Sequence, residues 1–114
     1  MNDCLFCKII ARQISAKVLF ENDRVIAIED INPQAALHAL IIPKTHIATL
    51  NDLTAGHDAL VGEMTRCAVS LAKERGFSQR GFRTVFNTNA DAGQTVFHIH
   101  LHVLGGRSLQ WPPG

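Results

Sequence analysis

The sequence of 114 residues contains no apolar run near the roughly 20 residues that a membrane-spanning helix needs. Its first ten residues, MNDCLFCKII, have neither a basic region ahead of a long apolar stretch nor a small-residue cleavage site, so we expect no signal peptide. Internal repeats, low-complexity tracts and linkers are also missing. We therefore expect a single domain over residues 1–114, located in the cytoplasm.

The chain also lacks a marked excess of positive or negative charge. The formal net charge is +1, and the 11 lysine and arginine residues are scattered along the chain. Proteins that bind nucleic acid polymers or anionic membranes usually cluster their basic residues. We expect neither partner, whereas a small anionic ligand remains compatible with this composition.

The chain has three cysteines, too few for a disulfide framework in a cytoplasmic protein. Cys4 and Cys7 form a C-x-x-C pair, which by itself fits a redox pair, half of a zinc site, or chance. Cys67 lies on the apolar stripe of a predicted helix, where core packing is the simplest interpretation.

Hydrophobic periodicity predicts an α+β domain with a mainly antiparallel sheet of about five strands. Helices are expected at residues 6–14 and 54–75, and strands at 17–22, 24–30, 38–43, 82–87 and 96–106. The long helix has an apolar stripe that includes Met64 and Leu71, an N-cap at Asp52 or Thr54, and Gly76 just after its end.

Half of the six histidines fall in the stretch HIHLH, residues 98–102. On a strand, Ile99 and Leu101 would face the core, while His98, His100 and His102 would share the opposite face about 7 Å apart. A merely solvated face would be served as well by threonine, lysine or glutamate, so we expect metal binding or catalysis. The three rings would span about 13–14 Å, too far to hold one metal ion together.

A neutral imidazole is a good nucleophile toward phosphorus and can form a phosphoramidate that water later cleaves. Such a site needs donors for the phosphate oxygens. The loop before the histidines can supply them, because Gly93 permits close backbone approach, Gln94 has an amide and Thr95 a hydroxyl.

The segment His98-Ile99-His100-Leu101-His102-Val103-Leu104 resembles the signature of the histidine triad (HIT) superfamily. The resemblance extends over nearly the whole chain, and its motifs match the Hint branch, the histidine triad nucleotide-binding proteins. These motifs are FCKII, DINPQA, HALIIPKTHI, VFNTNADAGQTVFHIHLHVLGGR and the terminal WPPG.

This resemblance implies a HIT-like fold and hydrolysis of purine nucleoside phosphoramidates, with cleavage of the AMP–N or GMP–N bond. The catalytic set would be His38, His98, His100 and His102: His100 attacks the α-phosphorus, His102 binds the phosphate, and His38 orients the nucleophile.

The resemblance also implies a nucleotide site. Asp30 would bind the ribose hydroxyls, although it can equally be a turn-forming residue. The apolar slot for the base would comprise Leu5, Phe6, Ile9, Ile28, Ile31 and Leu40. The phosphate region would comprise Asn87, Gly93, Gln94, Thr95 and Val96.

Members of this branch are homodimers, in which Trp111 would reach the partner's site. Thr95 and Asn32 stand where many relatives have serine, which can shift substrate preference.

Some members of the superfamily hold a structural zinc ion. Its ligands here would be Cys4, Cys7, His46 and His98, a closed site that adds stability and is not needed for the chemistry.

Three alternatives stay open at this point. The chain can be a purine-nucleotide-binding or protein-interaction module with incidental hydrolase activity, or a dinucleoside polyphosphate hydrolase. A metalloenzyme that uses the triad as ligands is the third, and the spacing disfavours it.

Overall fold

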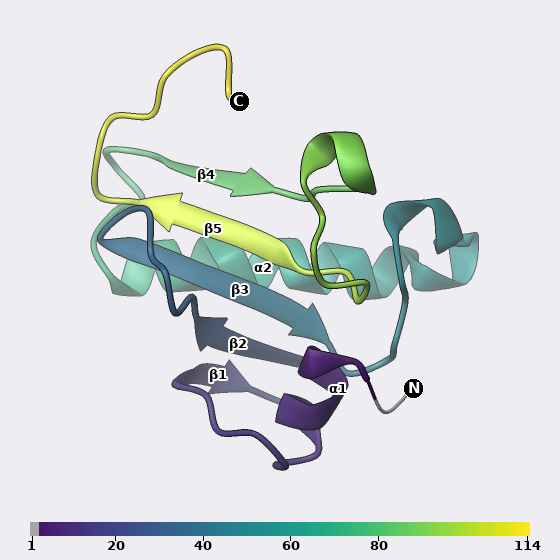
Figure 1. Cartoon of the computed structure of the whole chain (residues 1–114). Helices are drawn as coiled ribbons and strands as arrows, with labels where there is room; N and C mark the ends of the chain where they lie inside the picture. Colours follow the sequence, from purple (N-terminus) through teal and green to yellow (C-terminus); the bar gives the residue numbers. More distant parts are fainter. Residues whose placement is uncertain (1–2) are drawn as a thin grey trace.

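The structure is a computed structural model that describes residues 3–114. It confirms the α+β prediction and contains two α-helices and a five-stranded sheet over this range (Figure 1). The elements in chain order are α1 (Leu5–Ile10), β1 (Val18–Glu21), β2 (Val25–Glu29), β3 (Leu37–Pro43), α2 (Asp58–Glu74), β4 (Phe82–Val85) and β5 (Leu101–Gly105). Short 3₁₀ turns lie at Leu50–Asp52, Ala55–His57 and Ala90–Ala92.

The strand order is β1-β2-β3-β5-β4, and every neighbouring pair is antiparallel. β2 and β3 are joined through the loop at residues 30–36, and α2 connects β3 to the far edge of the sheet. Helix α2 lies across one face of the sheet, against β3 and β5 (Figure 1). Helix α1 packs on the opposite face, against residues of β2 and β3.

Strand alternation divides the buried residues into two clusters. Ala39, Ile41 and Val103 point toward α2, where they pack with Met64 and Leu71 of its apolar stripe. On the opposite face, Ile26, Ile28, Leu40 and Ile42 pack with Phe6 and Ile9 of α1. Because α1 covers only part of this second face, the sheet is open beside it, and the histidines lie there.

Both helices are shorter than the periodicity predicts. α1 ends at Ile10, not at residue 14, because Arg12 takes up a left-handed conformation with φ of 65°. α2 begins at Asp58, not at residue 54. Thr54 caps the preceding 3₁₀ turn instead, by accepting a hydrogen bond from the backbone N–H of Gly56 at 3.2 Å.

The last two strands are also shorter than expected. β4 ends at Val85 and β5 begins at Leu101, so His98 and His100 precede the strand. Their segment bonds elsewhere: the N–H of Ile99 donates to the carbonyl of Ile47 at 2.7 Å, and His100 Nδ1 bonds the carbonyl of His98 at 2.8 Å. These bonds replace a strand ladder in this segment.

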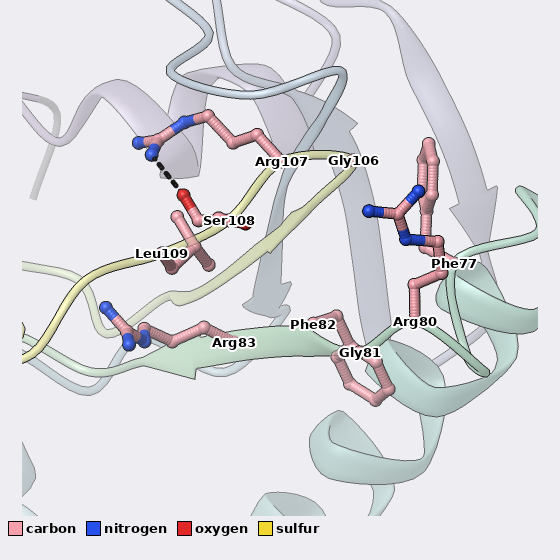
Figure 2. A pocket seen from close by; sticks show the side chains of 9 residues that line it. All are labelled: Phe77, Arg80, Gly81, Phe82, Arg83, Gly106, Arg107, Ser108 and Leu109. Carbon is pink, nitrogen blue, oxygen red and sulfur yellow. Dashed lines mark hydrogen bonds between the residues drawn. The ribbon is translucent and has the colours of Figure 1, made fainter.

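After β5 the tail folds back over the edge of the sheet. Arg107 donates to the carbonyl of Ser108 at 3.0 Å (Figure 2). Arg83 of β4 donates to the carbonyl of Gln110 at 3.1 Å. No helix within residues 3–114 is long and apolar enough to cross a membrane.

Candidate active site

Three histidines meet on the sheet face opposite α2. His38 comes from β3 and His102 from β5, and the ladder places Leu40 opposite His102, so His38 is a diagonal neighbour. His100 lies one residue before β5, with its ring centroid 5.1 Å from that of His102. The sequence prediction that His100 and His102 act together is therefore compatible with their geometry.

His100 has one ring nitrogen committed and one available. A carbonyl oxygen can only accept, so the 2.8 Å contact to the His98 carbonyl puts the proton on Nδ1. Burial lowers the pKa of His100, which keeps the ring neutral. The Nε2 lone pair is then free for nucleophilic attack. The Phe6 ring packs edge-on against His100, with centroids 4.9 Å apart, and limits its rotation.

His38 and His102 form a hydrogen-bonded pair of defined polarity. The backbone N–H of Gln34 donates to His38 Nδ1 at 3.0 Å, so the proton of the neutral His38 ring is on Nε2. That proton is donated to His102 Nδ1 at 2.9 Å. His102 therefore carries its own proton on Nε2, where it can donate to a phosphate oxygen.

The same environment makes the protein's stability depend on pH. Burial lowers the pKa of His38, and burial together with His100 and His38 lowers the pKa of His102 from 6.5 to about 4. Below pH 6.5 the unfolded chain thus binds more protons than the native chain. The free energy of unfolding should be highest above pH 6.5 and decrease between pH 7 and pH 5.

Urea unfolding at pH 7 and pH 5 measures this effect above the range where carboxylates titrate. His102→Gln should reduce the difference between the two pH values. An unchanged free energy of unfolding across this range in the parent protein would contradict the assigned protonation states.

A cavity of about 510 Å³ opens beside the histidines, within the usual size range for small-molecule sites. Every residue expected at the nucleotide site lines it except Trp111. These are Leu5, Phe6, Ile9, Ile28, Asp30, Ile31, Leu40, Asn87, Gly93, Gln94, Thr95, Val96, His100 and His102. The sequence reasoning missed Ile14, Ser15, Ala16 and Glu29, which also line it. Ile14 was assigned to the first helix, and no sequence signal placed its segment at the cavity.

In the loop at residues 88–95, the Gln94 side chain does not have the phosphate-donor role that the sequence predicts. Both the amide oxygen and nitrogen of the Gln94 side chain bond backbone groups, of Asn89 at 2.8 Å and of Ala48 at 2.8 Å. Its side chain is buried, so it shapes the loop and is not a free donor for a ligand. Within residues 3–114 the Thr95 hydroxyl and the Asn87 side chain make no hydrogen bond, and both remain available.

Asp30 lies at the end of β2 on the cavity wall. One carboxylate oxygen accepts from the Asn32 N–H at 2.8 Å, which is the turn role, and the other is 3.4 Å from His38 Nε2. This group of Asp30, His38 and His102 has the separations of a metal site. Both ring nitrogens of His38 are already hydrogen-bonded, however, so we interpret the group as a proton-ordering pair with a neighbouring acid.

His98 departs from the expected arrangement. It is fully buried and does not line the cavity, because its ring turns toward the N-terminal cysteines. Its Nε2 donates to the carbonyl of Pro43 at 2.7 Å, which leaves the Nδ1 lone pair facing Cys4 Sγ at 3.3 Å. The triad histidines therefore do not share one face as the strand alternation predicted. The backbone carbonyl of His98, not its ring, contacts His100.

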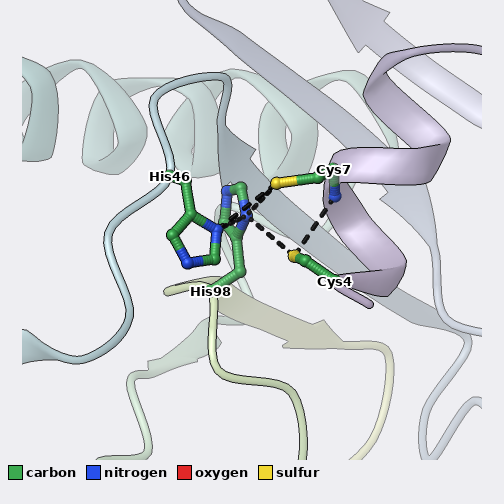
Figure 3. A group of neighbouring side chains, drawn as sticks. All are labelled: Cys4, Cys7, His46 and His98. Carbon is green, nitrogen blue, oxygen red and sulfur yellow. Dashed lines mark hydrogen bonds between the residues drawn. The ribbon is translucent and has the colours of Figure 1, made fainter. Parts of the chain in front are cut away.

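Cys4, Cys7, His46 and His98 converge at one point (Figure 3). His46 Nδ1 is 3.1 Å from His98 Nδ1 and 3.3 Å from Cys7 Sγ. Tetrahedral zinc would separate two nitrogens by about 3.3 Å and a nitrogen from a sulfur by about 3.6 Å, given its usual bond lengths. The donor set therefore fits a closed zinc site. Without a cation, burial and Cys4 raise the pKa of Cys7, which disfavours the thiolate.

Trp111 is 82% exposed and lies away from the cavity of its own chain. Val69 of α2 and Phe97 are also exposed apolar side chains. Large apolar groups on a surface often mark a contact with another molecule.

Comparison with known proteins places the chain among close relatives. The family model described as "Scavenger mRNA decapping enzyme C-term binding" matches residues 3–110. A HIT-like protein of Synechococcus elongatus is 48% identical over 112 residues, 98% of this chain and 97% of that protein. The purine nucleoside phosphoramidase of Escherichia coli K12 is 44% identical over 107 residues, 94% of this chain and 90% of the enzyme.

The same likeness holds for solved structures. The crystal structure of a HIT family hydrolase from Legionella pneumophila is 51% identical and has a TM-score of 0.97. That match covers 98% of this chain and all of the hydrolase chain (100%).

Proposed function

The chain belongs to the histidine triad superfamily, and from this premise we propose that it is a purine nucleoside phosphoramidate hydrolase. In this proposal it cleaves the AMP–N or GMP–N bond through a nucleotidyl intermediate on His100. The observation that carries the proposal is the His100 ring at the cavity wall, with Nδ1 bonded to the His98 carbonyl and Nε2 left unprotonated. The E. coli relative, named as a purine nucleoside phosphoramidase, supports the substrate class.

The reaction would have two balanced steps. His100 Nε2 forms a bond to the α-phosphorus while the bond from phosphorus to the substrate nitrogen breaks, and the amine leaves with that electron pair and takes up a proton. Water then attacks the same phosphorus and gives up a proton to solvent, which replaces the one the amine took up, and the bond to His100 breaks with its electron pair returning to Nε2. The second step releases the nucleoside monophosphate and returns the neutral imidazole.

The remaining wall of the cavity would bind the nucleotide. His102 Nε2–H and the Thr95 hydroxyl can donate to phosphate oxygens where negative charge develops. The buried Phe6, Ile9, Ile28 and Leu40 offer an apolar slot for the purine.

Three further features belong to the proposal. A zinc ion would be held by Cys4, Cys7, His46 and His98, where its chemistry is structural. A second copy of the chain would contact α2 and receive the exposed Trp111. We also keep the cytoplasmic location expected from the sequence, which suits the unpaired thiols of Cys4, Cys7 and Cys67.

Incubation of the purified protein with an adenosine 5′-phosphoramidate tests the function. Release of AMP and free amine is expected, at a rate well above that with a diadenosine polyphosphate. Tight AMP binding without turnover of either substrate would favour the nucleotide-binding module and overturn the hydrolase. Faster turnover of the diadenosine polyphosphate would identify the protein as a dinucleoside polyphosphate hydrolase.

Removal of the Asp30 charge should weaken nucleotide binding. A hydrogen bond to a charged acceptor is worth about 1.5–3 kcal/mol, so Asp30→Asn should raise KM at least about tenfold. For substrates that lack the ribose 2′- and 3′-hydroxyls, KM of Asp30→Asn should be close to KM of the parent protein. Asp23→Asn, on an exposed turn, is the matched control. If Asp30→Asn raises KM by the same factor for substrates with and without these hydroxyls, the ribose contact is excluded.

A further inference from the structure

A chain of three hydrogen bonds leads from the end of β5 into the histidine site. Arg107 Nε donates to the carbonyl of Gln34 at 2.8 Å, across 73 residues of sequence. The backbone N–H of Gln34 donates to His38 Nδ1 at 3.0 Å. His38 Nε2 then lies 2.9 Å from His102 Nδ1. Each bond joins a different segment of the chain to the next.

The proton positions on His38 and His102 follow from the Gln34 N–H, and Arg107 holds the residue that carries it. A guanidinium and a backbone N–H can only donate, so neither can reverse its role. If the Gln34 N–H lost its place, His38 could carry its proton on either nitrogen. His102 would then lose the partner that keeps its proton on Nε2.

Gln34 lies in the loop between β2 and β3, and contacts on several sides keep the loop in place. The Gln34 side chain donates to the carbonyl of Asn32 at 2.9 Å, and the Asn32 N–H donates to Asp30. These bonds lie within the loop. Arg107 connects the loop to the segment after the neighbouring strand β5 through the Gln34 carbonyl.

Gly106 allows the two segments to meet. It has a φ of +102°, and a Cβ built at this position would lie 2.7 Å from the Cβ of Ala36. Another residue would therefore force the tail away from the loop. The close contact places Arg107 where its guanidinium reaches the Gln34 carbonyl.

We propose that Arg107 and Gln34 are positioning residues of the histidine site: Arg107 fixes the backbone of Gln34 through its carbonyl, and the Gln34 N–H holds His38 and His102 in the tautomers that direct a donor at the charge developing on the phosphate oxygens. The inference rests on the proposed function of His102 as a phosphate donor. It assigns Arg107 a role beyond its bond to the Ser108 carbonyl (Figure 2).

Two variants distinguish the positioning of Gln34 by Arg107 from a purely structural role of Arg107 in holding the C-terminal tail. Arg107→Met keeps the length of the side chain and removes its donors. Arg80→Met is the matched control. Arg80 and Arg107 both line a pocket at the end of β5 (Figure 2). Arg80 makes no hydrogen bond or ion pair within residues 3–114. Arg107→Met should lower kcat about tenfold with KM changed less than about twofold, because molecules in the wrong tautomer lose the donor for the charge that develops in the transition state. Arg80→Met should change neither.

The direct measurement is the protonation of the rings. Long-range ¹H–¹⁵N NMR spectra of the free protein should show His38 and His102 each as a single Nε2–H tautomer. In Arg107→Met both should become mixtures, while Arg80→Met keeps the parent spectrum. Arg107→Lys, which retains a donor of similar reach, should restore part of the single-tautomer signal and of kcat.

A second pair of variants tests the role of the Gln34 backbone N–H. Gln34→Ala keeps the backbone N–H and should keep the His38 tautomer, whereas Gln34→Pro removes the donor and should lose it. If Gln34→Pro does not fold, the Arg107→Met spectra decide alone. Parent-like spectra and kcat in Arg107→Met would overturn the inference. Absence of turnover in the parent protein, with the tautomer changes still observed, would instead refute the proposed function.

Discussion

Replacement of His100 by alanine is expected to lower kcat/KM for an adenosine 5′-phosphoramidate by about four orders of magnitude, the typical cost of removing a nucleophile. The reason is the unique position of its Nε2. His102 has its lone pair on Nδ1 occupied by His38, and both nitrogens of His38 are bonded. Among the histidines described at the cavity, His100 alone presents a free lone pair.

AMP binding should persist in His100→Ala, with Kd changed by less than about tenfold, because the apolar slot and Asp30 are untouched. Steady-state kinetics and calorimetry measure the two quantities. His57→Gln is the matched control, since His57 lies at the start of α2 and not at the cavity. Turnover that survives in His100→Ala at the rate of the control would exclude the nucleophile and the mechanism with it.

Removal of the zinc ion that we propose at the cysteine–histidine cluster should destabilise the protein strongly. If the ion contributes about 3 kcal/mol at working concentrations, chelation should lower Tm by roughly 15 °C for a chain of this size. The cluster joins α1 to the segment before β5, through Cys4 and His98, so both lose an anchor. The base slot should loosen too, because α1 carries Leu5, Phe6 and Ile9.

Elemental analysis and thermal unfolding with and without chelator test this expectation. Cys7→Ser should remove the zinc and the effect of chelator together. Cys67→Ala should keep both, since Cys67 is buried in the core, where desolvation raises its pKa to about 11. Turnover at saturating substrate should continue after chelation in the molecules that remain folded. Protein that contains no zinc, and takes up none, would refute the site.

The fold was largely predictable from local pattern. The alternating strand residues and the stripe with Met64 and Leu71 reflect burial on a sheet face and a helix face, so they are visible in sequence. Element ends were less predictable. The left-handed Arg12 stops α1 without glycine or proline, and the 3₁₀ turn at Ala55–His57 has the same composition as a helix start.

Parts of the site required tertiary structure. The strand alternation assigned His98 to the same face as His100, but His98 bonds the carbonyl of Pro43 and turns to the cysteines. The resemblance to a known family, not the spacing, identified this ligand set. The contact between Arg107 and Gln34 had no local signal, because a side chain here meets a backbone carbonyl from a distant loop.

The stereochemical course at phosphorus tests the central claim most directly. Hydrolysis of a substrate made chiral at the α-phosphorus with sulfur and oxygen isotopes shows how many displacements occur. Attack by His100 followed by attack by water is two in-line displacements, each with inversion, so the account predicts net retention of configuration. Net inversion would mean that water attacks the substrate directly, and it would contradict a covalent intermediate on His100.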